Sequence, residues 1–288
     1  MNQKKKPEIY FHVGLGKTAS TYLQYKLFPK LKGIHYIQRT RYNDYPSIIE
    51  KHSDDKFLIS REFDRQFIRE TGKMAEYDPD ARIIVVLRRN DSWIASQYRR
   101  YVKNGGFKSF DAFLDLENNR GYWEREEVLF YPKLKFLEDH FNHKPLILFH
   151  DELKSNPWKF FQRIAEYTGT TYDKNQVSVR PSHKSYNTKQ LLIIRNLSKK
   201  LFKKDKVEGK TKLQHYIKFR SRWLLCHLIL YGAKIIPSNI EQREEIIPKS
   251  SMEKVKSYYA EDWQQCLDFA REKSYDPTAL EGLKKQTL

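Results

Sequence analysis

The stretch Ile9–Thr21, IYFHVGLGKTAST, decides the fold. Its first part, Ile9–Val13, is rich in β-branched and aromatic residues and predicts a short strand that ends at Gly14. A turn of Gly, Lys, Thr and Ser follows, and the apolar spacing of Tyr22–Leu31 predicts a helix. A strand, a glycine turn and a helix in this order are typical of the first unit of an α/β fold.

Three further strands are predicted downstream. Lys56–Ser60 (KFLIS) is flanked by charge, and Ala81–Leu87 (ARIIVVL) is the continuous apolar run of a strand buried on both faces of a parallel sheet. The fourth is Pro145–Phe149 (PLILF). Helical patterns follow the strands: a helix with Trp93 and Tyr101 on one side that stops before Gly105, then Glu124–Phe141 and Trp158–Thr168. We therefore expect an open parallel α/β sheet with right-handed crossovers and helices on both faces.

From about Thr188 onward the sequence pattern predicts helices and no further clear strand. We expect residues 1–187 to form the α/β core and residues 188–288 a helical C-terminal part of the same domain. Segment 195–222 holds eleven Lys and Arg against Asp205 and Glu208 only. A charge run of this kind usually forms a solvated face. It lies next to the apolar stretch Trp223–Ile236, so a core helix and a contact with an anionic membrane surface both stay open.

Charge and cysteine content narrow the class of protein. There are 54 Lys+Arg against 36 Asp+Glu, a net charge of +18, which predicts an anionic ligand or surface. With 39% hydrophobic residues the chain is neither collagen-like nor wholly disordered. Cys226 and Cys266 are too few for a disulfide framework, which indicates a reducing compartment. No segment has the length of a signal peptide core or a membrane span, so we expect a soluble cytoplasmic protein, with peripheral membrane contact as the open alternative.

The turn after the first strand has the composition of a phosphate cradle. Backbone N–H groups at such a turn face an anion, glycine lets the backbone approach it, and Lys17 adds a point charge. The candidate binding residues are Gly14, Gly16, Lys17, Thr18, Ala19, Ser20 and Thr21. A nucleotide triphosphatase loop would need glycine at position 11, which is Phe11. The apolar strand that ends at Leu87 continues into arginines where a magnesium-binding Asp would be expected, so a Mg-nucleotide hydrolase is disfavoured.

A second anion site is predicted at the end of the Ala81–Leu87 strand. Arg88 follows that strand directly, and Ser96 lies eight residues further on, inside the next helix. Open α/β sheets bind ligands outside the carboxyl ends of their strands. Arginine suits bidentate phosphate binding, and Ser96 can add one hydroxyl bond.

Taken together, these motifs resemble those of the sulfotransferases that use 3′-phosphoadenosine 5′-phosphosulfate (PAPS). Gly14–Thr21 is similar to their 5′-phosphosulfate loop, Gly-x-x-Lys-Thr/Ser-Gly-Thr-Thr, and Arg88–Ser96 to their 3′-phosphate motif. Phe149–Gly169 resembles the family's strand, Glu-x-Leu, Asn-Pro and closing helix. Ala19 replaces the usual loop glycine, and Thr168 replaces the usual Leu before the final glycine.

The resemblance covers roughly Glu8–Asn187 and implies a P-loop-like sulfotransferase architecture. It implies PAPS as co-substrate and transfer of a sulfuryl group to a hydroxyl or amine of a carbohydrate, lipid or small-molecule acceptor. Neither a metal nor a nucleic acid partner is expected. Arg180 and Lys184 lie in a basic loop that would cover the cofactor, although an ordinary linker fits them as well.

Two residues are expected to carry the chemistry. Lys17 would stabilise charge around the bond that breaks, and Glu62 would be the base. Glu62 follows the second strand, where family members acting on sugars often carry Ser-x-Glu, here Ser60 and Glu62. His12 and His183 are the alternative bases.

Two other classes of function stay open. One is a non-catalytic protein that binds an anion, a polysaccharide or a membrane, and the other is a kinase-like phosphotransferase. Stabilisation by the desulfated nucleotide without magnesium would favour the sulfotransferase, and stabilisation by Mg-ATP the kinase.

Overall fold

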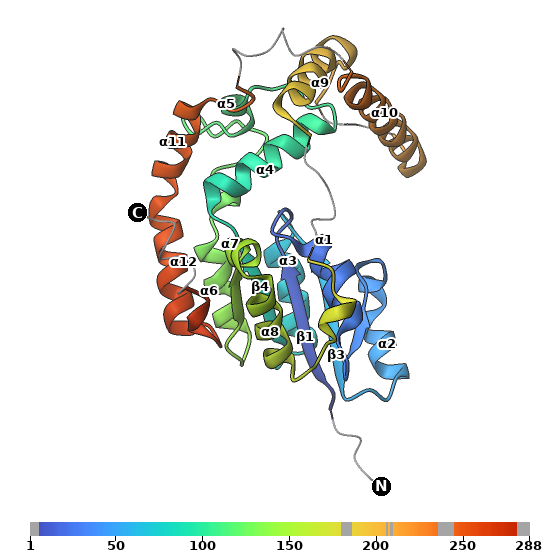
Figure 1. The fold of residues 1–288 in the computed structure, drawn as a ribbon, viewed down its shortest axis with the longest axis vertical. Helices are drawn as coiled ribbons and strands as arrows, with labels where there is room; N and C mark the ends of the chain where they lie inside the picture. The colour runs from blue at the N-terminus through green and yellow to red at the C-terminus, as the bar shows by residue number, and fades with distance from the viewer. Residues whose placement is uncertain (1–5, 180–185, 206, 208–209, 236–244, 281–288) are drawn as a thin grey trace. The chain divides into compact units, whose positions relative to one another are not determined.

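The computed structural model describes residues 6–179, 186–205, 207, 210–235 and 245–280 (Figure 1). These residues form two compact units. The first comprises the described parts of 1–89, 129–182 and 260–288, and the second those of 90–128 and 183–259.

The first unit is built on a five-stranded sheet in which all paired strands are parallel, in the order β2-β3-β1-β4-β5. The strands are β1 (Glu8–Gly14), β2 (His35–Ile37), β3 (Lys56–Glu62), β4 (Arg82–Leu87) and β5 (Leu146–Phe149). The four predicted strands are confirmed as β1, β3, β4 and β5. Strand β2 was missed because it has three residues, two of them only half-buried, at the edge of the sheet.

Helices cover both faces of the sheet, as predicted. On one face Tyr10, Leu58 and Val86 pack into a core with Phe28 and Phe160. The opposite face holds Phe11 and Phe149, and the ring of Phe149 lies 5.8 Å from that of Trp263. The helices of this unit are α1 (Ser20–Tyr22), α2 (Tyr45–Lys51), α3 (Phe67–Tyr77), α6 (Tyr131–His140), α7 (His150–Ser155), α8 (Pro157–Thr168) and α12 (Ala260–Lys273).

The segment predicted as a helix over Tyr22–Leu31 is less regular than expected. Helix α1 is a single turn, a π-helical turn continues it over Leu23–Leu27, and a 3₁₀ turn over Phe28–Lys30 ends it. Pro29 stands inside the last turn and cannot continue an α-helix. Wide turns of this type often mark functional sites.

The second unit is helical. Its helices are α4 (Asn90–Lys103), α5 (Phe110–Phe113), α9 (Thr188–Leu201), α10 (Lys212–Gly232) and α11 (Lys249–Tyr258). Asn187 starts α9 with a capping box that it shares with Gln190. Trp93 of α4 is buried and meets Trp123 edge to face at 5.1 Å. Trp93 is therefore a core residue of this unit.

The division into units differs from the expected boundary at residue 187. Helix α12 belongs with the sheet, since the carboxylate of Asp262 accepts hydrogen bonds from the N–H groups of Phe130 and Tyr131. Periodicity shows that a helix has a buried face but leaves open which element covers it. Among the described residues no helix is both long enough and apolar enough to span a bilayer.

Candidate active site

The phosphate-type loop leaves β1 at the carboxyl edge of the sheet. Lys17 (φ 69°) and Ala19 (φ 70°) both have the left-handed backbone, which L-residues seldom adopt. Alternation of such residues with ordinary ones turns successive N–H groups toward a concave side, a geometry that binds anions. The side chain of Lys17 is exposed.

Buried hydroxyls hold this loop from the inside. Thr18 Oγ1 and Ser20 Oγ both donate to the carbonyl oxygen of Leu15, at 2.7 and 3.2 Å. A Cβ on Gly14 would lie 2.1 Å from Ser20 Oγ, so the packing of Ser20 requires this glycine. Thr18 and Ser20, expected to bind the cofactor, use their hydroxyls to shape the loop in this structure, and their contacts to a ligand stay a prediction.

Ala19→Gly is expected to raise the free energy of unfolding by about 0.5–1 kcal/mol. Glycine reaches φ 70° without the steric cost that alanine has there, and this gain exceeds the entropy that glycine adds to the unfolded chain. Chemical denaturation measures the change. The matched control Ala75→Gly, inside α3, is expected to destabilise by about 1 kcal/mol; equal losses for both variants would contradict the assignment of strain to Ala19.

Glu62 comes together with the loop. It is the last residue of β3, it lies opposite Gly14 in the sheet, and its Oε1 accepts a hydrogen bond of 3.0 Å from Thr21 Oγ1. The neighbouring Arg61 donates instead to the carbonyl oxygen of Arg39. Because of this pairing and this hydrogen bond, the half-buried carboxylate of Glu62 lies at the carboxyl edge, beside the predicted binding residues.

Arg88 also reaches the loop. It follows β4 directly, is half-buried, and its guanidinium donates to the carbonyl oxygen of Lys17 at 3.2 Å. Ser96 lies half-exposed on α4 in the second unit, and its pairing with Arg88 stays a prediction. Arg180, Lys184 and His183 lie outside the described residues.

His12 is a core residue. Its side chain is fully buried, its Nδ1 lies 2.8 Å from Ser60 Oγ, and Gln24 donates to the same oxygen at 3.0 Å. Burial lowers the pKa of His12 to about 3, so its imidazole stays neutral. Ser60, the partner of Glu62 in the expected Ser-x-Glu element, is part of this buried network.

Three polar residues at this edge, Asp64, His150 and Asp151, were not assigned a role from the sequence. The carboxylate of Asp64 accepts a hydrogen bond of 2.8 Å from the N–H of Gly16, so the loop already binds one anionic oxygen. His150 and Asp151 follow β5. Burial, assisted by the charge of Arg88, lowers the pKa of His150, and His150 with Lys154 holds the pKa of Asp151 well below its ordinary value. No spacing in the sequence marks Asp64, because its partner is a backbone amide 48 residues away.

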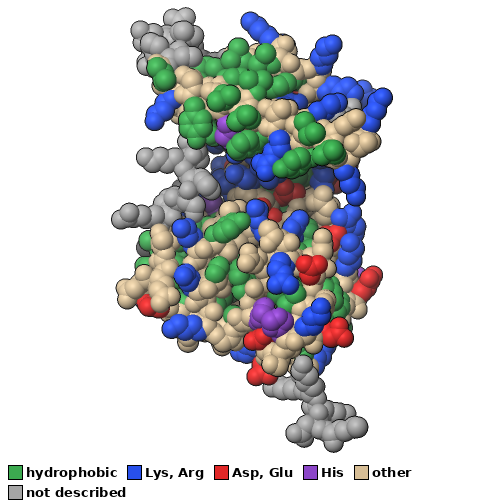
Figure 2. All heavy atoms as spheres, turned by 90° about the vertical axis from the view of Figure 1, so that its right-hand side faces the viewer, with side chains coloured by type: hydrophobic (Ala, Val, Ile, Leu, Met, Phe, Trp, Pro, Cys, Tyr) green, Lys and Arg blue, Asp and Glu red, His purple; other side chains and the backbone are tan. Residues whose placement is uncertain are grey.

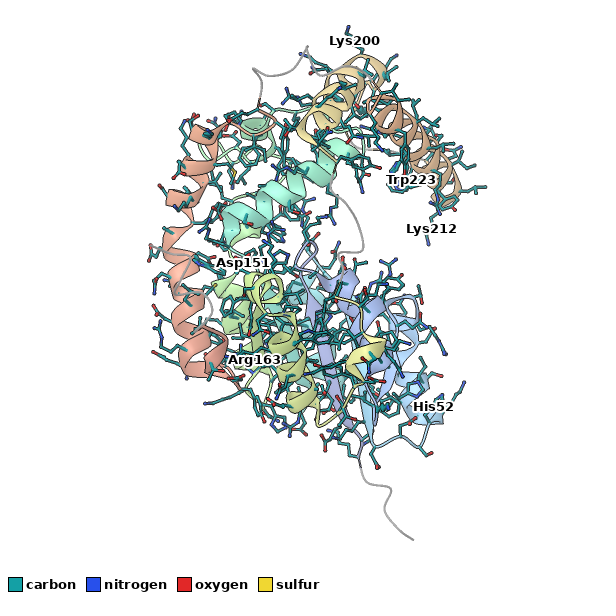
Figure 3. The ribbon with its side chains drawn as sticks, in the orientation of Figure 1. His52, Asp151, Arg163, Lys200, Lys212 and Trp223 are labelled. Carbon is teal, nitrogen blue, oxygen red and sulfur yellow. The ribbon has the colours of Figure 1, made fainter. Side chains whose placement is uncertain are left out.

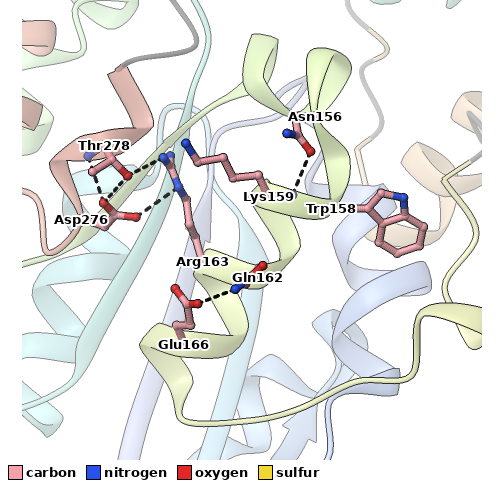
Figure 4. A pocket seen from close by; sticks show the side chains of 8 residues that line it. All are labelled: Asn156, Trp158, Lys159, Gln162, Arg163, Glu166, Asp276 and Thr278. Carbon is pink, nitrogen blue, oxygen red and sulfur yellow. Dashed lines mark hydrogen bonds and ion pairs between the residues drawn. The ribbon is translucent and has the colours of Figure 1, made fainter.

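The Glu-x-Leu element supports the fold through an ion cluster centred on the buried Arg163; Figure 4 shows Arg163 with Asp276 and Thr278. Arg163 is 4% exposed and reaches Glu152 at 2.7 Å, Asp276 at 3.1 Å and Thr278 Oγ1 at 2.7 Å. Burial raises the pKa of Glu152 to about 7, an effect that Arg163 opposes. The cluster ties α7 and α8 to the segment after α12.

The second unit contains a pocket of about 500 Å³ with an aromatic wall. Tyr101, Tyr122, Trp123, Phe219 and Trp223 contribute rings to it. Gln97 also lines the pocket and is 2% exposed, and neither atom of its amide has a partner among the described residues. A buried amide without partners is costly unless a ligand or water satisfies it.

One group of described residues could hold a metal ion: His35, His52 and Asp54. His35 begins β2, and Asp54 precedes β3, so the group lies at the amino ends of these parallel strands. The carboxyl edge with Lys17 and Glu62 is the opposite one. The group thus does not belong to the candidate site.

No family model matches the sequence, and a search of curated proteins found no match. Among solved structures, a sulfotransferase from Alicyclobacillus acidocaldarius has 15% sequence identity and a TM-score of 0.51, over 76% of this chain and 96% of that one. Mouse sulfotransferase SULT7A1 complexed with PAP has 13% identity and a TM-score of 0.44, over 96% and 89%. The chain has the α/β fold of the bacterial sulfotransferase, as its loop motifs implied.

Proposed function

We propose that this protein is a sulfotransferase that uses PAPS and transfers the sulfuryl group to a hydroxyl or amine. One observation supports the proposal above all. The guanidinium of Arg88 and the carboxylate of Glu62 both contact the loop at Lys17, at one edge of the sheet. That sheet belongs to a fold shared with a bacterial sulfotransferase. An anion-binding loop, a cation and a candidate base are the parts that transfer of an anionic group needs.

Each residue has a distinct task in the proposed reaction. PAPS, when bound, supplies the activated sulfuryl group. Arg88 binds a phosphate of the nucleotide, and Lys17 stabilises the charge that develops on the bridging oxygen. Glu62 takes the proton of the acceptor hydroxyl while the acceptor oxygen bonds to sulfur and the bond from sulfur to the nucleotide's phosphate oxygen breaks.

The acceptor that we propose is a carbohydrate hydroxyl. The Ser60 and Glu62 pair supports it, because it resembles the element of family members that act on sugars. The second unit, taken by itself, has a pocket suited to a sugar, since aromatic rings such as those of Tyr101 and Tyr122 pack on sugar rings and an amide such as that of Gln97 bonds to hydroxyls. A volume of about 500 Å³ is within the usual range for small-molecule sites. A lipid hydroxyl is the second acceptor class that the sequence leaves open.

A transfer assay with labelled PAPS tests the function. Separate pools of glycans and of lipids are incubated with the wild type and with Lys17→Ala. Label is expected to enter the glycan pool with the wild type and to fall sharply with the variant. Transfer to neither pool, by protein that binds the desulfated nucleotide, would contradict the proposal, and transfer to lipid alone would correct the acceptor.

Arg88→Ala is expected to weaken binding of the desulfated nucleotide by about 1.5–3 kcal/mol, the usual contribution of a hydrogen bond to a charged group. Turnover at saturating PAPS should change less, since the contact is made equally before and during transfer. Calorimetric titration measures the affinity. Arg82→Ala, at the opposite end of β4, is the control and should bind normally; Ser96→Ala should show a smaller defect than Arg88→Ala. Equal affinities of Arg88→Ala and wild type would refute the role.

A further inference from the structure

One solvent-facing stripe of α10 is apolar. The helix buries Cys226 and Leu230 against its own unit. Five large side chains on the opposite side are between 55% and 67% exposed: Leu213, Ile217, Leu224, Leu228 and Tyr231. At about 3.6 residues per turn, these positions fall within an arc of about 60° and extend over about 27 Å of helix. We name these five residues the apolar stripe.

Cations surround this stripe. Helix α10 contains no Asp or Glu, and Lys212, Lys218 and Arg220 on it are exposed. The segment before it adds further exposed cations: Lys199, Lys200, Lys203, Lys204 and Lys210. Asp205 is the one acidic side chain among the described residues from 186 to 235. Figure 2 shows hydrophobic side chains intermixed with Lys and Arg over this part of the second unit.

Aromatic side chains pack against one of the cations of α10. The guanidinium of Arg220 lies over the rings of Tyr216 and Trp223, at 5.4 and 5.9 Å from their centres, and its Nε donates to Tyr216 Oη. Trp223 and Lys212 both lie along α10, and Lys200 is on α9 (Figure 3). Amphipathic aromatic rings and long basic side chains are the residue types that favour the boundary between lipid headgroups and acyl chains.

We propose that the apolar stripe and its cations bind the surface of a lipid bilayer that carries anionic headgroups. The stripe would enter the acyl boundary, with α10 parallel to the surface, and the lysines would pair with headgroup phosphates. A second copy of the chain fits less well, because two faces of the same positive charge repel each other. The proposal does not depend on the proposed sulfotransferase activity.

Sedimentation with lipid vesicles tests the proposal on the full-length protein. The probes are vesicles of phosphatidylcholine mixed with phosphatidylglycerol, and vesicles of phosphatidylcholine alone. We expect binding to the mixed vesicles, weaker binding to the neutral ones, and a loss of binding as salt is raised. Leu224→Gln/Leu228→Gln should weaken binding at least about tenfold. Its control, Ile68→Gln/Tyr77→Gln, changes two exposed apolar residues of α3 and should bind like the wild type.

A charge-reversed pair provides a second variant that leaves the apolar packing intact. Lys212→Glu/Lys218→Glu should weaken binding to mixed vesicles at least about fivefold per lysine, whereas Lys254→Glu/Lys256→Glu on α11 should have little effect. The proposal is overturned if the mixed vesicles are not bound, or if both control variants lose as much affinity as their test variants. It is also overturned if light scattering shows a dimer that the leucine variants dissociate. Vesicle binding without sulfuryl transfer would contradict only the proposed function.

Discussion

Glu62→Gln is expected to lower turnover by about 10²–10⁴-fold at saturating PAPS, the usual contribution of a general base. The amide keeps the shape of the side chain and can still accept the hydrogen bond from Thr21, but it cannot take a proton from the acceptor. Affinity for the desulfated nucleotide should therefore stay close to that of the wild type. Turnover and nucleotide affinity are measured on the same preparation, so that a folding defect is recognised.

Glu76→Gln is the matched control, since Glu76 lies exposed on α3 of the same unit. It should leave turnover unchanged. Near wild-type turnover of Glu62→Gln with a working acceptor would reject Glu62 as the base. Because burial lowers the pKa of the fully buried His12 to about 3, the search would then turn to His183, the other alternative base, and to groups at the carboxyl edge such as His150.

Arg163→Leu is expected to reduce the free energy of unfolding by about 3–5 kcal/mol, the usual result of removing one member of a buried ion pair. The substitution leaves the carboxylate of Glu152, which is 4% exposed, without its partner at 2.7 Å. Glu152→Gln/Arg163→Leu should recover part of the loss, because no charge then remains buried at this position. Denaturant unfolding measures all three proteins.

Arg271→Leu is the control for an exposed pair. Arg271 and Asp268 are 57% and 45% exposed, so this variant should lose less than about 1 kcal/mol.

The pH dependence of the free energy of unfolding gives a second test of the Glu152 site. Burial raises the pKa of Glu152 from 4.5 to about 7, so the native state binds this proton more tightly than the unfolded chain does. The contribution of Glu152 to stability should then fall as pH rises from 4.5 to about 7, and Glu152→Gln should remove that slope. Two results together would contradict the structural role of this ion pair. They are a loss of stability in Arg163→Leu no larger than that in Arg271→Leu, and a pH slope of stability in Glu152→Gln equal to that of the wild type.

The sheet and the loop were predictable from local signals. A continuous apolar run such as Ala81–Leu87 has few alternatives to a buried parallel strand, and the residues after Gly14 carry the composition of an anion-binding turn. The parallel order then places Glu62 beside Gly14, because strands β1 and β3 pair along their whole length. The approach of Glu62 to the loop therefore followed from the fold class.

Other features depend on partners far along the chain. The hydroxyls of Thr18 and Ser20 serve the loop itself, and Asp64 binds Gly16, since the surrounding structure decides which partner a small polar group takes. Strand β2 is too short to give a period-two pattern. Helix α12 is held in the sheet-containing unit by Asp262, which accepts hydrogen bonds from the N–H groups of Phe130 and Tyr131, more than 130 residues away in the sequence. The left-handed backbone of Ala19 was also not predicted, although the family's glycine at that position was the signal for it.

The proposed function requires the loop at Lys17 and Arg88 to bind a nucleotide with phosphates at both the 3′ and 5′ positions. Calorimetric titration with 3′-phosphoadenosine 5′-phosphate, in chelator and without magnesium, tests it most directly. We expect saturable binding by the wild type and a marked loss of affinity in Lys17→Ala, with Mg-ATP bound far more weakly. Tight binding of Mg-ATP together with no detectable binding of the bisphosphate would contradict it.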